Sequence, residues 1–193
     1  MTIQQPASIS LQNSPDHSLS HRVFANDDAA PVLSITVDSS GNVTNKYRLL
    51  QPMGELDYFN MTGTSVTISG TSDGSTNMVV VPVATTLSND SGFDNGGANN
   101  GRLRYTGATT RMFHVAVTVS GTPQNVNDIF VFGVAKNGTP DCKVLGSASG
   151  TQFSALHCMV ELATNGYIEL YVGNTTAGRN FTVKSLNIFA MGM

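Results

Sequence analysis

The sequence contains no tryptophan, and only 12% of its 193 residues are charged. Lys and Arg together number 10 and Asp and Glu number 13, which gives a formal net charge of −3. This balance excludes the dense basic surface that is typical of a nucleic-acid-binding domain. Two small basic pairs, Lys46/Arg48 and Arg102/Arg104, are interpreted as solvated strand ends, because no aromatic residues are interleaved with them.

Long apolar runs are also missing. No segment approaches the roughly 20 apolar residues that span a bilayer, and the N-terminal MTIQQPASIS lacks the basic and apolar regions of a signal peptide. The sequence therefore predicts synthesis in a cytosol, with no membrane contact. Two cysteines, Cys142 and Cys158, fit a reducing compartment. A bridge between them remains an alternative, but we favour two free, buried thiols.

Helical periodicity is scarce, whereas strand and turn residues are abundant. No long stretch repeats apolar residues at i, i+3 and i+4, and glycine alone accounts for 19 residues. We therefore predict an all-β jelly-roll sandwich of about eight to nine antiparallel strands over residues 51–193. The expected strands are 54–63, 64–71, 77–87 with Pro82 at an edge or bulge, 101–107, 111–121, 128–138, 151–163, 166–174 and 181–193. Residues 88–101 are expected as a long polar loop.

Residues 1–50 differ from the rest of the chain. They contain three prolines, scattered Ser and Asp, and few large apolar residues, so they cannot build a core of their own. Two tracts have strand-like sequence: residues 19–24, and residues 32–44 as a hairpin around 39–42. We predict an extended N-terminal arm that anchors the protein to a partner; a disordered leader is the alternative.

Three strands show one clearly aliphatic face and one mixed face of Met, His, Phe or Tyr. The aliphatic sets are 113/115/117/119, 156/158/160/162 and 168/170/172. The stretch DIFVFGVAKNG, residues 128–138, is apolar on both faces, although a strand with one face in water should alternate. Since Tyr and Met are enriched at subunit interfaces, we predict that another copy of the chain covers this second face.

From Phe113 onward the order of strands and turns resembles the trimeric jelly rolls of the tumour-necrosis-factor and complement-C1q class. The resemblance is carried by MFHVAVTVS, IFVFGVAKNG, SALHCMVELA, a turn at Thr164-Asn165-Gly166, YIELYVGN and FTVKSLNIFAM. It implies a homotrimer in which the tyrosines of the GYIELYV strand lie near the threefold axis. The expected trimer interface is Tyr167, Tyr171, Phe130, Phe132, His114 and Met159.

A second resemblance is to small virion proteins of tailed bacteriophages. It is carried by NNGRLRYTGATTRMFHVAVTVS and, in the arm, by SPDHSLSHR, DDAAP and VDSSGNV. It implies a structural protein of the virion: a capsid decoration, head-fibre or adaptor protein that joins capsid, collar or tail proteins. The expected particle-docking residues are His17, His21, Arg22, Asp27 and Asp28.

The alternative function is a receptor-binding fibre head that recognises a host-surface glycan or protein. Receptor-binding loops tend to display aromatic residues, whereas SGTPQNVND, GSASG and GNTTAGRN are built from Gly, Ser, Asn and Thr. The loop composition therefore favours the structural role.

Few residue patterns indicate chemistry. His17 and His21 have no further ligand nearby for a metal, and Asp90 and Asp94 lack the spacing of a calcium loop. Glu161 and Glu169 flank one turn, but as a glycosidase pair they have no support beyond proximity. The sequence contains no nucleophile elbow and no phosphate-binding glycine loop. We predict no enzymatic activity, no metal and no cofactor.

Overall fold

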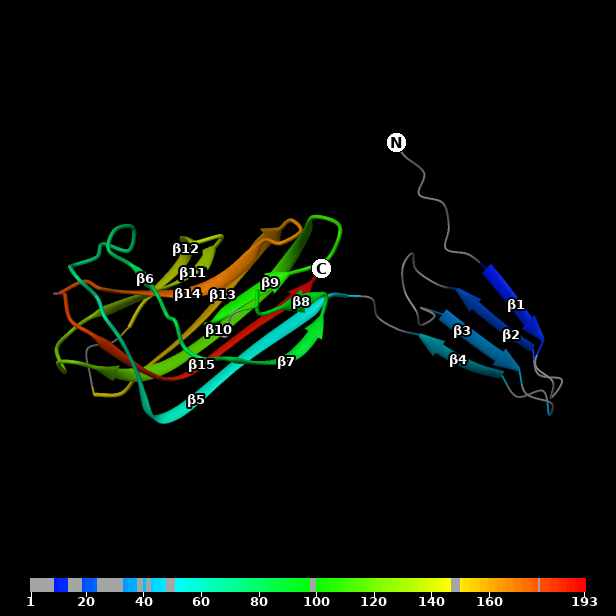
Figure 1. The fold of residues 1–193 in the computed structure, drawn as a ribbon, viewed down its shortest axis with the longest axis horizontal. Helices are drawn as coiled ribbons and strands as arrows, with labels where there is room; N and C mark the ends of the chain where they lie inside the picture. The colour runs from blue at the N-terminus through cyan, green and yellow to red at the C-terminus, as the bar shows by residue number, and fades with distance from the viewer. Residues whose placement is uncertain are drawn as a thin grey trace. The chain divides into compact units, whose positions relative to one another are not determined.

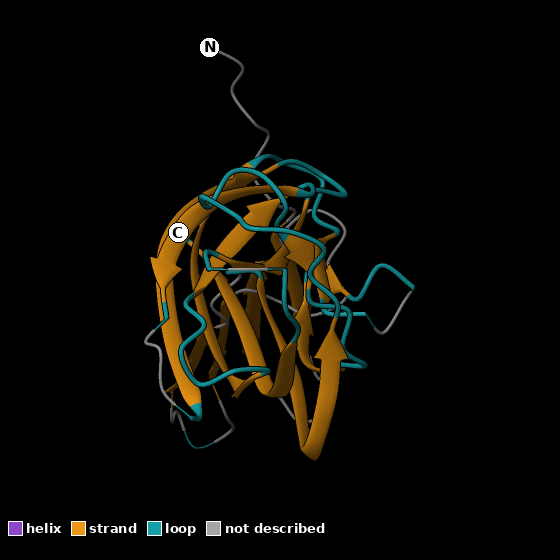
Figure 2. Ribbon diagram, turned by 90° about the vertical axis from the view of Figure 1, so that its left-hand side faces the viewer, coloured by secondary structure: helices purple, strands orange, loops and turns teal. Residues whose placement is uncertain are grey.

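The computed structural model describes residues 9–13, 19–23, 33–37, 40, 43–47, 51–97, 100–146, 150–176 and 178–193. The chain divides into two compact units, Met1–Leu50 and Gln51–Met193 (Figure 1). All regular structure in the described residues is strand, and Figure 2 accordingly shows strands and loops but no helix. The described residues therefore contain no helix long and apolar enough to cross a membrane.

The first unit contains a four-stranded antiparallel sheet whose strands follow chain order. The strands are β1 (Ile9–Asn13), β2 (Leu19–Val23), β3 (Leu33–Val37) and β4 (Val43–Tyr47). Pairing of β3 with β4 confirms the expected hairpin, with Ser40 in its turn. Pairing of β1 with β2 and of β2 with β3 differs from the extended arm expected from the sequence, because these strands satisfy one another's backbone groups.

The second unit is a sandwich of two antiparallel sheets (Figure 1). The first sheet has the order β13 (Gln152–Leu162), β10 (Arg111–Pro123), β15 (Phe181–Gly192), β5 (Met53–Val66) and β7 (Thr86–Ser91). The second sheet has the order β12 (Thr139–Leu145), β11 (Phe130–Lys136), β14 (Tyr167–Asn174), β9 (Arg102–Tyr105) and β8 (Phe93–Asp94), and β6 (Val79–Val80) also pairs with β14.

The order of these strands is that of a jelly roll. β10, β11, β13, β14 and β15 each lie in the other sheet from the strand that precedes them, so neighbours within a sheet are distant in sequence. β11 and β12 stay together through a tight hairpin at Asn137 and Gly138, both of which have positive φ (50° and 82°). Asn-Gly provides these angles at low cost. The predicted all-β jelly-roll sandwich is therefore confirmed.

Alternate residues of each strand fill the space between the sheets. The three aliphatic faces expected from the sequence all point inward, and their members are buried apart from Cys158, which is half-buried. Two groups of aromatic rings anchor this core, one at Phe93, Tyr105 and Phe113 and the other at Phe130, Phe132 and Phe181. Centroid separations of 4.8 to 5.4 Å are in the range of favourable aromatic pairs.

The second face of β11 is covered by the chain itself, which corrects the expectation of another copy there. Val131 and Ala135 are 4% and 0% exposed within a single chain. The segment 71–80 lies over this face: a Cβ on Gly133 would sit 3.2 Å from Met78 Cε, and one on Gly74 would sit 3.6 Å from Val131 Cγ2. The segment is tied down by a hydrogen bond from Ser72 N to the Asn174 carbonyl (2.7 Å). This covering explains a strand without a polar face.

Two further elements differ from the sequence expectation. Residues 54–71 were expected as two strands, but β5 runs without a break through an irregularity at 60–63, where Gly63 has φ of 82°. Residues 88–101 were expected as a polar loop, but they contain the end of β7 and the whole of β8. Phe93 causes the second difference, because its ring packs on Tyr105 and Phe113 in the core.

We expect Gly173→Val to lower the free energy of unfolding by about 1–3 kcal/mol, the usual cost of overpacking. A Cβ at position 173 would lie 2.7 Å from Ser72 Cβ, so the added side chain must push segment 71–80 away from β14. Denaturant unfolding measures the effect. Gly150→Val is the matched control, because nothing lies within 4 Å of its Cβ position. Equal stability of the two variants would contradict the covering role of segment 71–80.

Candidate functional site

The outward face of the first sheet is the candidate functional surface, and we call it the open face. Because side chains alternate along a strand, it is formed by the residues of β13, β10, β15 and β5 that do not enter the core. Pairing registers place these residues in rows across the four strands. The rows are Met159–His114–Met191–Met53, His157–Ala116–Phe189–Glu55, Ala155–Thr118–Asn187–Asp57 and Phe153–Ser120–Ser185–Phe59, with Met112 and Glu161 beyond the first.

Large apolar side chains on the open face are uncovered. Phe153 is 77% exposed, Phe59 is 76% exposed and Met159 is 48% exposed. Met61, in the irregularity of β5 next to Phe59, is 75% exposed. Phe and Met are enriched at protein–protein interfaces, so these side chains give the face the composition of an interaction site. They are spread over the face, since Phe153 and Phe59 stand at the two ends of one row and Met159 stands three rows away.

A hollow lies beside Phe153 on the same face. It is lined by small or short side chains from β10, β13 and β15, namely Thr118, Val119, Ser120, Ser154, Ala155 and Ser185, together with Phe153 itself. The hydroxyls of Ser120 and Ser185 are hydrogen-bonded to each other at 2.6 Å, so they do not need water as a partner. The open face therefore has both a protruding ring and a recess that an apolar group can enter.

Charged groups lie at the margins of the open face. Glu161 is on the edge strand β13, and Glu55 and Asp57 are on β5. Asn187 donates to both carboxylates of β5, at 3.0 Å to Glu55 and 2.6 Å to Asp57. These carboxylates stand on the same two outer strands, β13 and β5, as the exposed Met159 and Phe59, so the face mixes charged and apolar groups.

His114 and His157 meet near the centre of the open face. Their rings are stacked, with centroids 5.4 Å apart, and His157 Nδ1 lies 3.3 Å from His114 Nε2. The pair comes from adjacent strands, because the register sets His157 opposite Ala116 and His114 opposite Met159. Two titratable groups are thus in direct contact on an apolar surface.

The expected interface residues are divided among three places. His114 and Met159 are on the open face. Phe130 and Phe132 are 0% and 1% exposed and belong to the core between the sheets, so their expected place at an interface is wrong. Because DIFVFGVAKNG is apolar on both faces, sequence periodicity alone does not say which face points inward.

Tyr167 and Tyr171 lie on the outward face of the second sheet, on the opposite side of the sandwich from the open face. The Arg102 guanidinium is 4.0 Å from the centroid of the Tyr167 ring and donates to Glu169 at 2.8 Å. Burial, helped by the Glu169 carboxylate, raises the pKa of Tyr171. These rings contact their own chain, and an interface role for them stays a prediction.

The expected docking residues belong to the first unit. His17, Asp27 and Asp28 lie outside the described residues. His21 and Arg22 are in β2, where His21 is paired with Leu11 and with Ile35. Their role in docking stays a prediction.

The carboxylates considered from the sequence have different surroundings. Arg104 binds both oxygens of Asp94 (2.8 and 2.7 Å) and holds the pKa of this carboxyl below its usual range. Glu161 is exposed on the open face, whereas Glu169 is buried in the other sheet. In the part of the chain that the structure describes, no three His, Cys, Asp or Glu side chains form a group able to hold a metal ion.

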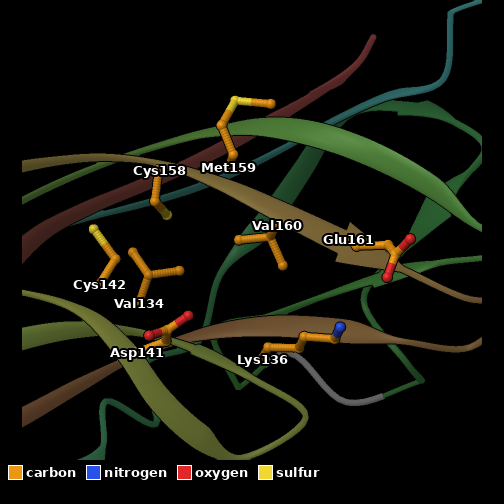
Figure 3. A pocket seen from close by; sticks show the side chains of 8 residues that line it. All are labelled: Val134, Lys136, Asp141, Cys142, Cys158, Met159, Val160 and Glu161. Carbon is orange, nitrogen blue, oxygen red and sulfur yellow. The ribbon is translucent and has the colours of Figure 1, made fainter.

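The two cysteines lie at the edge where β12 faces β13, in a small pocket (Figure 3). Both thiols are free, and Cys142 donates to the His157 carbonyl at 3.5 Å. Burial, together with the neighbouring Cys142, raises the pKa of Cys158 to about 12. Since the thiolate is the reactive form of cysteine, this environment makes Cys158 a poor nucleophile.

Sequence reasoning missed two prominent residues of the open face, Phe59 and Phe153. Phe153 shares the alternating set of His157 and Met159, and Phe59 continues the outward set of Met53, Glu55 and Asp57, so alternation is a usable signal for both. Met61 carries no such signal, because it lies in the irregularity at 60–63.

Solved structures with a similar chain path include murine APRIL at pH 5.0, with a TM-score of 0.45 and 12% sequence identity over 72% of this chain and 98% of that chain. Eiger TNF from S. frugiperda has a TM-score of 0.42 and 13% identity over 72% of this chain and 92% of that chain. No protein-family model and no curated protein sequence matches the chain.

Proposed function

We propose that the protein is a structural subunit that assembles with copies of itself through the open face and is carried on a bacteriophage particle. The exposure of Phe59, Phe153 and Met159 on one sheet face supports self-assembly most directly. The described residues offer a binding surface and no group of metal ligands. The proposed role is mechanical and involves no catalysis.

A second copy of the chain is the proposed occupant of the open face. Strand spacing and rise give this face an area on the order of 500 Å², which approaches the roughly 800 Å² that each partner contributes to a standard interface. The exposed Phe and Met side chains are of the types enriched in contacts between protein subunits. A closed trimer is the proposed form, because the order of strands and turns from Phe113 onward resembles that of trimeric jelly rolls. In a cyclic trimer the open face of each copy packs on a different surface of its neighbour.

The virion role is proposed from the sequence patterns of residues 99–120 and of the first unit. Residues 1–50 form a unit separate from the jelly roll, which suits an attachment segment. Three such segments on one trimer would act together, and linked weak contacts raise avidity by orders of magnitude. The proposed product is a capsid decoration, head-fibre or adaptor protein in the virion.

A receptor-binding fibre head is the second candidate. It is favoured by a hollow lined by Thr71, Ser72, Asp73, Ile129, Leu145 and Thr175, which combines polar groups with exposed apolar ones. Leu145 is 66% exposed at its edge. The test measures binding of the isolated protein to host cells. If Leu145→Ser abolishes this binding but the variant is still incorporated into particles, the receptor-binding candidate is supported over the structural one.

We expect the isolated protein to be a trimer at micromolar concentration and Met159→Glu to be a folded monomer. The substitution replaces an apolar side chain of the open face by a carboxylate, which assembly would bury at high cost. Mass measured by light scattering reports the assembly state. Thr139→Glu is the matched control, an exposed strand position in the second sheet that should leave the trimer intact. A native monomer, or a trimeric Met159→Glu protein, would contradict the proposal.

We expect deletion of residues 2–45 to leave a folded trimer that no longer joins the particle. Assembly would be kept because the open face lies within residues 51–193. The measurement compares incorporation of truncated and full-length protein into particles that lack it. Equal incorporation would mean that the anchor lies in the jelly roll. A truncated chain that fails to fold would mean that the first unit is part of the folded domain and that the expected boundary near residue 50 is wrong.

A further inference from the structure

The contact between His114 and His157 restricts the protonation states that the pair can hold. A hydrogen bond between Nδ1 of one ring and Nε2 of the other, at 3.3 Å, needs one nitrogen with a proton and one with a lone pair. A neutral pair and a singly protonated pair both meet this condition. A doubly protonated pair does not, and it sets two positive rings against each other with centroids 5.4 Å apart.

The neighbours of the pair on the open face are mostly apolar. Met159 and Met191 flank His114 on the two adjacent strands. Phe189 is in the same row as His157 but two strands away, with Ala116 between them. These side chains offer no hydrogen-bond acceptor that would stabilise an imidazolium ion well. Covering the face therefore favours the neutral rings, since burial disfavours the charged form of histidine.

Charged and titratable groups approach the pair from the surrounding strands. Glu161 lies further along β13 on the same face. Glu55 and Asp57 lie on β5, beyond β15, where Asn187 binds both. At the edge of β13, Cys142 donates to the His157 carbonyl, and the adjoining pocket contains Asp141 and Lys136. Any acid effect must therefore be separated from titration of these carboxylates.

We propose that the His114–His157 pair makes self-association through the open face pH-dependent, so that assembly holds while the rings are neutral and weakens on acidification. The inference rests on the proposed function, because it concerns regulation of the same face. In the separate chain His157 is exposed, so water can solvate the charge that assembly would bury. Imidazole is the side chain that ordinarily changes charge between pH 5 and 8.

The direction of the effect follows from proton linkage. If the assembled state binds fewer protons than the separate chains, acid drives dissociation. For each proton that assembly excludes, the association constant then falls by up to about tenfold for each unit by which the pH is lowered. Because the contact disfavours a second proton on the pair, each chain contributes about one such proton to the dependence.

The test measures the assembly state of the full-length protein by sedimentation equilibrium between pH 8.0 and pH 5.5. We expect the concentration at half-dissociation to rise at least tenfold over this range. His114→Gln/His157→Gln should assemble at pH 8.0 and lose most of the pH dependence, and His157→Gln alone should lose about half. Glu161→Gln is the control for carboxylate titration and should keep the native dependence. Circular dichroism at each pH verifies that the chains remain folded.

The outcomes separate the two proposals. A native protein that is monomeric at every pH overturns the proposed self-association. A native assembly with the same half-dissociation concentration at pH 8.0 and 5.5 overturns the histidine inference alone. The histidine inference is also overturned if the double glutamine variant keeps the full pH dependence of the native assembly. If the double variant fails to assemble, the same result with His157→Gln overturns it.

Discussion

The alternation of side chains along the strands is the constraint on which the structure depends. In a two-layer sandwich, one set of alternate residues fills the core and the other set must meet water or a covering group. The core residues include two groups of aromatic rings, one around Phe113 and the other around Phe181. What the chain does with the other set differs between the two sheets.

The second sheet covers much of its own outward face. Segment 71–80 lies over β11 and β14, and Arg102 stacks on Tyr167 while it neutralises Glu169. The first sheet has no comparable cover among the described residues: Phe59, Phe153 and Met159 stay exposed. This contrast between the two sheets is the physical basis for proposing the open face as the surface of assembly.

Much of the fold is predictable from local pattern. The aliphatic sets of β10, β13 and β14 identify their inward faces, and Asn137-Gly138 identifies the tight hairpin. Prediction fails where distant segments decide the outcome. The cover over β11 comes from residues more than 50 positions earlier in the chain, and Phe93 turns a polar stretch into a strand because of partners at 105 and 113.

The candidate site is predictable to a smaller extent. His114 and Met159 follow from alternation, but Phe130 and Phe132 were misplaced because both faces of β11 are apolar. The contact between His114 and His157 requires the register of β10 with β13, which places residues 43 positions apart in the chain within 3.3 Å. Sequence periodicity supplies the face of each residue but not this register.

The most direct test of the account is hydroxyl-radical footprinting of the full-length protein at low and at high concentration. If copies of the chain cover the open face, labelling of Phe153 and Met159 falls as concentration rises. Labelling of Leu145, which is 66% exposed on the edge strand β12 of the second sheet, should stay constant. Protection of Leu145 with continued labelling of Phe153 and Met159 would contradict the account, because the copies would then meet through another surface.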